Sequence, residues 1–598
     1  MTKIETKSML RSERVRKRKH ADDSTPDSNK PERPVSCIVP PIGPKERVTD
    51  HPERVIDLLN PMPAVIVNTR QLGRALSFGF AGGDTVGAIR SALHNAPLEE
   101  TEWDPTCFEG GLFLKDLFST CMQVAVPKLK PVIDTVFLTR LLTHPPKDPA
   151  VVDYRRAILE ELVSDAPLRE AFEKTYRSLY NLRELFESES RFYDPDGRQR
   201  RLETLAAIMK TVKEMRDGFE QSKSGLSRLR RYATYAVDTD GFKRLEALLD
   251  FDNHLAAVDL KLRIGADGNI RRFEISNMAE NRENPFHQSP IRRFFTRIQM
   301  MFRGYIFSEG ELVNRWVDSV FEGIEPLLPP LIQTIGEMEF YLAALAFRDM
   351  ALSKGLKVCF PTLHAPNSDS GKGSAGHEVA GLFNPLLFGQ DITPVPCDLK
   401  TEKWETITVV TGPNSGGKTR LLQAVAIAQM LAQAGMFVPA EKAVFCRAPG
   451  LFVSLIEEAR ADSREGRLGT ELIRIRNLFE KSRPGSLVVL DELCSGTNPS
   501  EGEEIFRLVI SLLDELGPSV FITTHFLQFA ARLAAETDKA AHLQFLKVEL
   551  DDNECPTFKF NPGVADTSLA HQTAARLGVT REELLMLVRR NRRALKTE

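Results

Sequence analysis

Eight consecutive residues in the C-terminal half combine glycines, hydroxyls and one lysine in a pattern suited to holding phosphate groups. The β-branched run 407–410 precedes them, and a helix-compatible segment, 421–431, follows. Glycines let backbone N–H groups turn inward around phosphate oxygens, and the N-terminus of the following helix adds a favourable field. The pattern predicts a nucleotide-binding loop made of Gly412, Pro413, Asn414, Ser415, Gly416, Gly417, Lys418 and Thr419. We expect Lys418 to reach the β- and γ-phosphates of ATP, and the Thr419 hydroxyl to bind Mg²⁺.

Two adjacent carboxylates and one histidine follow later apolar runs. Asp491 and Glu492 end the buried-strand pattern 486–490, and His525 ends the run 520–524. Parallel sheets place ligands at the carboxyl ends of their strands. Asp491 therefore suits the Mg²⁺ shell, Glu492 suits the polarisation of an attacking water, and His525 suits a hydrogen bond to the γ-phosphate. The order of loop, carboxylates and histidine is that of the ABC-type ATPases, and it indicates hydrolysis by positioning and charge neutralisation.

The segments that must position these residues change character along the chain. Residues 1–52 are poor in aromatics and rich in charge, which predicts a disordered basic tail. Residues 53–130 are interpreted as a small N-terminal segment, to which the sequence assigns no role. Helical periodicity dominates 131–363, interrupted by a β-hairpin pattern over 256–276. Residues 364–380 read as a linker, and strand-like and helical runs alternate over 381–598, which is typical of an α/β domain with a largely parallel sheet.

Composition excludes several classes of protein. The 598 residues leave room for about three to five domains. Acidic residues (82) nearly balance basic ones (79), and the net charge of -3 excludes a chain that is basic all over and coats nucleic acid. The eight cysteines form no CxxC pair, and no run of apolar residues is long enough for a membrane span or a secretory signal. We expect a cytoplasmic protein, nucleoid-associated if bacterial, with no membrane partner.

Several motifs together resemble the MutS family of DNA mismatch repair ATPases and their stand-alone relatives. Thr411-Gly412-Pro413-Asn414 with Gly417-Lys418-Thr419 is similar to the family's phosphate loop, and Asp491-Glu492-Leu493 with Gly496-Thr497-Asn498 is similar to its extended Walker B motif. Further similarities lie at Phe437-Val438-Pro439-Ala440, at Thr523-Thr524-His525-Phe526, and at Pro562-Gly563 with Ser568. Weaker ones lie at 138–156 and 335–361, so the resemblance covers about 131–598 and is strongest from 381 onward. The resemblance implies a multidomain fold, in which an all-α lever core precedes an α/β ABC-type P-loop ATPase domain with C-terminal helices.

Three departures from the family pattern limit what the resemblance implies. Residues 53–130 are too short for the mismatch-recognition domain, and the single Phe-x-Glu, at Phe307, falls among core helices. The DNA clamp is reduced to the hairpin at 258–275, and the Ser-Thr-Phe signature is replaced near Gly466, where Ser463 or Thr470 is a candidate substitute. The nuclease domain of one branch of the family is also expected to be absent.

Clusters of basic residues are candidates for contacts with DNA phosphates, with solvated helix faces as the simpler explanation. We rank first the cluster between two long helices, where a lever tip would meet DNA: Lys223, Arg228, Arg230 and Arg231. Next come the hairpin residues Lys261, Arg263, Arg271 and Arg272, followed by Arg292, Arg293, Arg297 and Arg303. The basic run 589–593 is interpreted as a solubilising end.

The sequence therefore predicts an Mg²⁺-dependent ATPase that binds mismatched or otherwise non-standard double-stranded DNA and couples ATP to lever movement in DNA repair. A homodimer is expected, because a partner subunit completes this type of site. The alternative is a nucleotide-gated scaffold that acts on recombination intermediates or on a protein partner without reading mismatches. A transporter ATPase subunit is disfavoured by the helical segment that precedes the phosphate loop.

Overall fold

A computed structural model describes fifteen stretches of the chain. They are residues 51–80, 87–124, 126–127, 129, 133–187, 198–254, 257–264, 270–279, 309–365, 376–390, 392–455, 467–494, 498–536, 542–566 and 577–594. All of them belong to one compact unit, Lys45–Glu598. Of the predicted basic tail, only its last two residues fall inside the described part.

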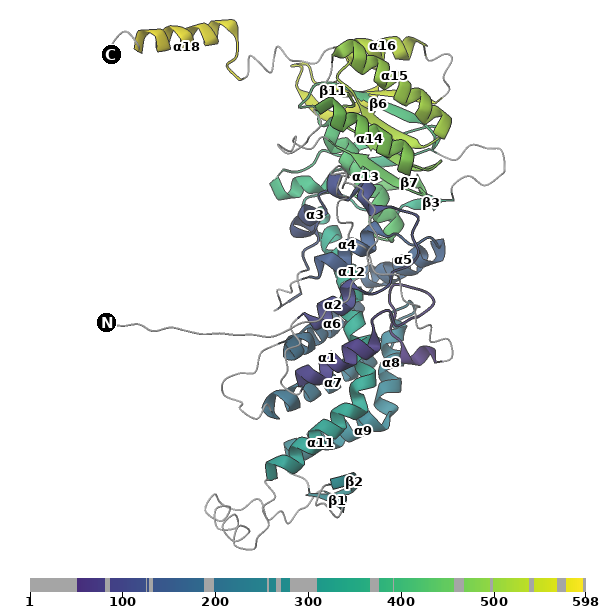
Figure 1. Cartoon of the computed structure of the whole chain (residues 1–598), viewed down its shortest axis with the longest axis vertical. Helices are drawn as coiled ribbons and strands as arrows, with labels where there is room; N and C mark the ends of the chain where they lie inside the picture. Colours follow the sequence, from purple (N-terminus) through teal and green to yellow (C-terminus); the bar gives the residue numbers. More distant parts are fainter. Residues whose placement is uncertain are drawn as a thin grey trace, which may run out of the picture. The chain divides into compact units, whose positions relative to one another are not determined.

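Helices make up the first half of the described chain (Figure 1). In the N-terminal segment they are η1 (Pro52–Arg54), α1 (Thr69–Phe80), α2 (Ala88–His94), η2 (Pro105–Cys107), η3 (Glu109–Gly111) and α3 (Leu114–Cys121). They continue as α4 (Thr135–Thr143), α5 (Pro149–Ser164), α6 (Ala166–Glu187), α7 (Arg198–Gly218), α8 (Ser227–Asp238), α9 (Asp240–His254), α11 (Glu309–Ile324), η4 (Glu325–Leu327) and α12 (Leu328–Ser353).

Local sequence explains where several of these helices begin and which side they bury. The Asp134 carboxylate accepts a hydrogen bond from the Phe137 N–H and starts α4, while Asp148 caps α5 immediately before a proline at its first position. In α6 the apolar residues recur at three- and four-residue steps, and this stripe is buried as the periodicity predicts.

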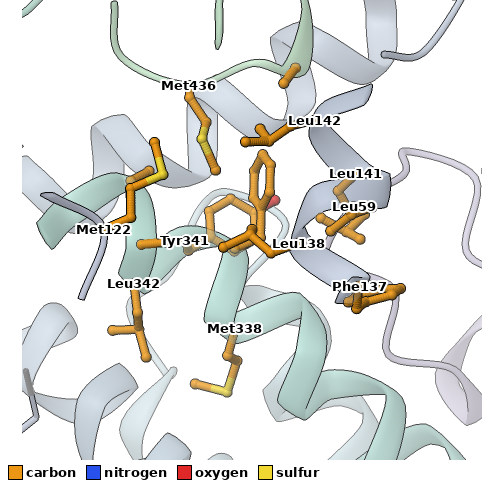
Figure 2. Packing of buried hydrophobic residues seen from close by; sticks show 14 of the residues in the cluster. Leu59, Met122, Phe137, Leu138, Leu141, Leu142, Met338, Tyr341, Leu342 and Met436 are labelled. Carbon is orange, nitrogen blue, oxygen red and sulfur yellow. The ribbon is translucent and has the colours of Figure 1, made fainter. Parts of the chain in front are cut away.

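Helix α12 is buried along most of its length, because helices and the N-terminal segment surround it. Figure 2 shows part of this packing, in which Met338, Tyr341 and Leu342 of α12 lie among Leu138 of α4 and Met436, which follows α13 (Lys418–Ala434). Such contacts join the N-terminal segment, the helices and the C-terminal part into one continuous apolar cluster. The predicted segment 53–130 therefore does not have a separate core.

A two-stranded antiparallel hairpin stands where the alternating pattern predicts one. Strands β1 (Ala257–Ile264) and β2 (Ile270–Ala279) pair between α9 and α11. The side chains of this hairpin lie outside the described part of the structure. Both neighbouring helices carry more acidic than basic residues.

The C-terminal part contains two sheets in the described residues. The larger one has the strand order β12-β11-β6-β10-β9-β8 and is parallel except at β12. Its strands are β6 (Ile407–Thr411), β8 (Leu451–Ser454), β9 (Leu487–Leu490), β10 (Ser519–Thr523), β11 (Leu543–Leu550) and β12 (Pro556–Pro562). The smaller sheet, in the order β3-β7-β4-β5, consists of β3 (Thr362–His364), β4 (Glu378–Leu382), β5 (Cys397–Lys400) and β7 (Lys442–Cys446).

Each face of the larger sheet is covered by a separate apolar cluster. Val410, Val489 and Phe521 belong to the cluster shared with α13 and the N-terminal helices. Their neighbours Val409 and Val488 belong to a second cluster on the other face. That second cluster includes apolar residues of α14 (Arg467–Lys481), α15 (Pro499–Leu516) and α16 (Leu527–Glu536). Two further helices of the C-terminal part are η5 (Pro385–Gln390) and α18 (Arg581–Ala594).

The predicted linker 364–380 needs correction at both ends. Its first residue ends β3, which pairs with β7, and Glu378 begins β4, which pairs with both β5 and β7. Pairing with strands far along the chain thus orders segments that composition alone marks as a loop. Residues 366–375 of this range lie outside the described part.

Two findings about the described residues concern cysteines and membranes. The seven cysteines among them are free thiols. None of the described helices combines the length and the apolar character that crossing a bilayer requires.

Candidate functional site

The glycine-rich loop connects β6 directly to α13, as the strand–loop–helix pattern predicts. Gly417 has a φ of 86° and caps the helix, and Gly412 has a φ of 139°, a conformation that side chains other than glycine rarely adopt. A Cβ on Gly412 would lie 2.6 Å from Cγ2 of Val548, and one on Gly416 would lie 2.8 Å from the same atom. Close approach to Val548 therefore requires glycine at both positions.

Lys418 begins α13 and is almost fully buried. Its Nζ donates hydrogen bonds to the carbonyl oxygens of Gly412, at 2.9 Å, and Pro413, at 3.0 Å, so the ammonium lies over the loop. Burial lowers the pKa of Lys418, and the nearby carboxylates of Glu492 and Asp491 oppose that shift. A cation held in this way is placed to meet an anion bound at the loop.

Asp491 is the centre of the polar contacts at the end of β9. Its Oδ2 accepts a hydrogen bond from the Thr419 hydroxyl at 2.7 Å, and its Oδ1 accepts one from the Thr523 hydroxyl at 2.6 Å. The Thr523 oxygen in turn accepts the backbone N–H of Glu492 at 2.7 Å. Glu492 has a φ of 45°, in the left-handed region, where a residue other than glycine is strained.

Strand order explains why residues so far apart in sequence meet here. Strand β10 pairs in parallel with β6 on one side and β9 on the other, so the carboxyl ends of all three coincide. The loop, the two carboxylates and His525 therefore lie at one edge of the sheet. His525 is exposed, and its ring lies against Phe526 at a centroid distance of 4.2 Å.

The structure adds two residues that sequence reasoning left without a role. Thr523 appears there as part of a strand and of a family-like segment without a role of its own, yet its hydroxyl connects Asp491 with Glu492. Phe558 is a half-exposed aromatic residue with a φ of 62°, and its ring edge lies 3.3 Å from the position that a Cβ on Gly417 would occupy. Phe558 lies on β12, which pairs with the preceding strand β11, and the non-local pairing of β11 with β6 brings this hairpin to the loop.

The donor set at this edge is compatible with Mg²⁺. Among the described residues there is no group of three or more His, Cys, Asp or Glu side chains that could hold a metal ion. Mg²⁺ typically takes one or two protein carboxylates and completes its shell with water and substrate phosphates. The adjacent Thr419 hydroxyl and Asp491 carboxylate meet that requirement next to the loop.

The replaced signature segment is only partly described. Gly466 and Ser463 lie outside the described residues, whereas Thr470 and Glu471 occupy the first turns of α14. Gly496 and Thr497 of the extended Walker B similarity also lie outside.

One of the predicted DNA contacts is corrected by the structure. Arg228 is buried, and its guanidinium donates to the backbone carbonyls of Asp57, Asn60 and Pro61 and lies over the Tyr154 ring. The side chain fastens α8 to the N-terminal segment and is not presented to solvent. Sequence spacing cannot detect this role, because the carbonyls belong to a segment about 170 residues away.

The other three members of that cluster lie at the surface. Lys223 and Arg231 are exposed, and Arg230 forms an ion pair with Glu220 at 2.8 Å. The turn that carries Lys223 is anchored by Glu161 of α5, which accepts the backbone N–H groups of Lys223 and Ser224, whereas Arg230 and Arg231 lie on α8. The cluster thus sits beside α5, and the hairpin β1–β2 emerges at the other end of the α8–α9 segment.

The side chains of the remaining candidates for DNA contacts lie outside the described part of the structure. The side chains of Lys261, Arg263, Arg271 and Arg272 are outside the described part, although the backbone register pairs Arg263 with Arg272. Arg292, Arg293, Arg297 and Arg303 are outside it altogether.

The fold and the site together define a domain with a largely parallel sheet, in which a glycine-rich loop connects a strand to a helix. Comparison with known proteins shows which family this domain resembles. Residues 408–594 match the family model of MutS domain V. The relatives include proteins named endonuclease MutS2 from Thermomicrobium roseum, 31% identical over 295 residues, and from Thermus thermophilus, 28% identical over 279 residues. A third, from Bacillus cytotoxicus, is 34% identical over 208 residues.

These matches cover only parts of the proteins concerned. They span 46%, 46% and 34% of this chain, and 36%, 34% and 25% of the respective relatives. The chain thus aligns with about a third or less of the length of each. Residues 408–594 thus match a domain of the MutS family, this part of the chain is similar to MutS2, and the resemblance that the motifs indicate is confirmed.

Proposed function

We propose that this protein is an Mg²⁺-dependent ATPase of the MutS type that binds DNA and couples ATP binding and hydrolysis to movement of its helical core. The observation that carries the proposal is the convergence of Lys418, Thr419, Asp491 and Glu492 at one edge of the parallel sheet. On this proposal the fold is a P-loop ATPase domain, 381–598, preceded by a lever core, 131–363. We also propose that the protein is located in the cytoplasm.

The geometry supports a division of roles among these side chains. The backbone of 412–417 surrounds the phosphates, and Lys418 neutralises the β- and γ-phosphate oxygens. Mg²⁺, held by Thr419 and Asp491, supplies charge neutralisation of the phosphates when bound. Glu492 orients and polarises the attacking water, His525 donates to the γ-phosphate, and Thr523 fixes both carboxylate residues. The exposed ring of Phe558 offers a stacking surface for the base.

Loss of the loop lysine tests the nucleotide site. Lys418→Ala is expected to weaken ATP binding about 100-fold, because charge-assisted hydrogen bonds to two phosphates disappear. Isothermal titration with ATP–Mg²⁺ measures the change, and Lys442→Ala, at an exposed lysine of β7, is the matched control. Unchanged affinity in Lys418→Ala would remove the nucleotide site from the proposal.

The proposed base is tested by Glu492→Gln. The amide keeps the shape of the side chain but cannot polarise water, so hydrolysis should fall about 10²- to 10⁴-fold while ATP stays bound. Single-turnover hydrolysis and retention of labelled ATP on a filter measure the two effects. Hydrolysis at the parental rate would show that Glu492 is not the base.

DNA binding and dimerisation extend the proposal. Lys223, Arg230 and Arg231 are the surface candidates for phosphate contacts, and the hairpin arginines and lysine are the next. Contacts of this kind give salt-dependent binding without sequence preference. A homodimer is proposed because a site of this type is completed by the signature segment of a second subunit.

A second candidate is a nucleotide-gated scaffold for recombination intermediates or for a protein partner, without mismatch recognition. Two observations favour it. Arg228 is committed to holding the fold, and the helices on either side of the hairpin carry more acidic than basic residues. Acidic arms repel the phosphate backbone and leave fewer cations for a duplex.

Gel-shift titrations separate the two candidates. Homoduplex, single-mismatch and four-way-junction DNA are compared at two salt concentrations, with and without ATP–Mg²⁺. Tighter binding of the mismatched duplex supports the first candidate, and preference for the junction supports the second. Equal weak binding of all three probes contradicts mismatch recognition.

A further inference from the structure

The segment of residues 55–66, here called the strap, is fastened inside the molecule by side chains of three helices. Its first six residues are buried. On α12, Glu337 accepts the Leu58 N–H at 2.9 Å, Gln333 accepts the Ile66 N–H at 2.7 Å, and the Tyr341 hydroxyl donates to the Leu58 carbonyl. The strap therefore follows α12 closely, because these bonds are buried and directional.

Helices α5 and α8 hold the other side of the strap. The Tyr154 hydroxyl donates to the Asp57 carbonyl at 3.1 Å, and Arg228 of α8 donates to three strap carbonyls. Arg155, next to Tyr154 on α5, donates from Nε to the Leu59 carbonyl at 3.0 Å. Displacement of the strap would leave several of these buried groups unpaired, which is costly.

Arg155 also contacts the C-terminal end of α13. Its Nη1 donates to the carbonyl of Ala434, the last residue of that helix, at 3.0 Å, and its guanidinium lies over the Phe340 ring of α12 at 5.3 Å. A Cβ on the following residue, Gly435, would lie 3.1 Å from the Arg155 Cβ. One buried guanidinium thus connects α13, the strap and α12.

The opposite end of α13 is the phosphate loop. A helix of 17 residues is about 25 Å long and moves as a nearly rigid rod. A shift at Lys418 therefore reaches Ala434, and Arg155 must follow, because otherwise the Ala434 and Leu59 carbonyls lose their buried donor. Figure 2 shows apolar packing beside this link, where Met436, Leu59 and Tyr341 lie in one cluster.

We propose that Arg155 is a positioning residue that transmits movement of the phosphate-loop helix through the strap to α12 and α8. The inference rests on the proposed ATP site and adds a route by which that site acts on the helical core. It gives the N-terminal segment a role, since buried hydrogen bonds of the strap and of Arg155 connect the end of α13 with α12 and α8.

Hydrogen exchange of the strap, with and without saturating ATP–Mg²⁺, tests the route in the full chain. In the parental protein, nucleotide should change exchange of strap amides about tenfold. Arg155→Lys keeps the positive charge but replaces the branched guanidinium with a single ammonium group. The ammonium can donate to only one of the Leu59 and Ala434 carbonyls. The ATP-dependent change at the strap should then fall below about twofold, while exchange at 412–419 still reports bound nucleotide.

Arg183→Lys is the matched control. Arg183 of α6 is equally buried and faces α12 through Glu339, with Glu187 as its second ionic partner. This variant should retain the full ATP-dependent change at the strap. If the loss of any buried arginine disturbed the helices in general, both variants would lose the ATP-dependent change at the strap. That result would overturn the proposal.

A second matched pair of variants tests the route even if Arg155→Lys folds poorly. Tyr341→Phe removes the hydroxyl that binds the strap, whereas Tyr176→Phe removes one that donates to Glu339 at 3.0 Å. The first should reduce the strap response and the second should not. Equal responses in these two variants, or an unchanged response in Arg155→Lys, would overturn the route while ATP binding still stands. Failure of the parental chain to bind ATP would instead overturn the proposed function and the route together.

Discussion

The side chains at the sheet edge are held by one another as much as by their strands. Asp491 accepts both threonine hydroxyls, and Thr523 also accepts the Glu492 N–H. These short bonds set the direction of both carboxylate residues before any ligand arrives, which is the arrangement that electrostatic catalysis requires. The strained φ of Glu492 is maintained by the same threonine.

Thr523→Val tests this support at the residue scale. The substitution removes a buried hydrogen bond to a charged group, so kcat should fall roughly 10- to 100-fold. Thr523→Ser keeps the hydroxyl and should stay within about threefold of the parental rate. Steady-state ATP hydrolysis measures both, and equal rates in the valine and serine variants would contradict the supporting role.

Elements extend these contacts across the molecule. Helix α13 joins the phosphate loop to Arg155, and α12 is surrounded by the N-terminal segment, α4, α5 and α6. Helix α8 is attached to the strap through Arg228. The start of α8 is therefore fixed by contacts with the rest of the fold, whereas its basic residues predict an exposed lever tip.

Arg228→Met and Arg231→Met form the test at the element scale. The first removes the guanidinium from three strap carbonyls, of which the Asp57 carbonyl keeps the Tyr154 hydroxyl, and it should lower the free energy of unfolding by about 3 kcal/mol. The second changes an exposed side chain and should alter it by less than about 0.5 kcal/mol. Urea denaturation followed by circular dichroism measures both, and a small effect of Arg228→Met would remove its anchoring role.

On the scale of the whole molecule, buried polar groups tie the helices into a single core. Glu339 of α12 accepts the Asp134 N–H at 2.9 Å and the Tyr176 hydroxyl at 3.0 Å, and Arg183 approaches it at 3.7 Å. Burial raises the pKa of Glu339 to about 7 from a usual 4.5, although these partners oppose the shift.

Stability should therefore depend on pH through Glu339. A raised pKa means that the folded state binds the proton more tightly, so this contribution is complete below pH 4.5 and is lost as pH rises through about 7. The expected loss is roughly 1–3 kcal/mol. Thermal melts of the parental protein and Glu339→Gln across this range measure it.

The comparison with Glu339→Gln is needed because another group acts in the opposite direction. Burial lowers the pKa of His377 to about 3, so its contribution is present above pH 6.5 and is lost as pH falls through about 3. The difference between parental protein and variant isolates Glu339. A difference that does not vary with pH would show that Glu339 titrates normally.

The amino-acid sequence by itself determined the features that contiguous residues encode. The loop 412–419 between strand and helix, the hairpin and the buried stripe of α6 follow from local periodicity and glycine placement. Contiguous residues carry these patterns, so local chemistry is sufficient to predict them, although distant residues complete the packing around each one.

Only the tertiary structure decided what distant residues do together. Thr523 supports Asp491 from 32 residues away, Arg228 holds a strap 171 residues before it, and Arg155 joins that strap to a helix end 279 residues later. An arginine that must satisfy buried carbonyls has the same local sequence as one that faces water. The difference lies in which backbone groups the fold brings beside it, because a buried carbonyl needs a donor and a solvated one does not.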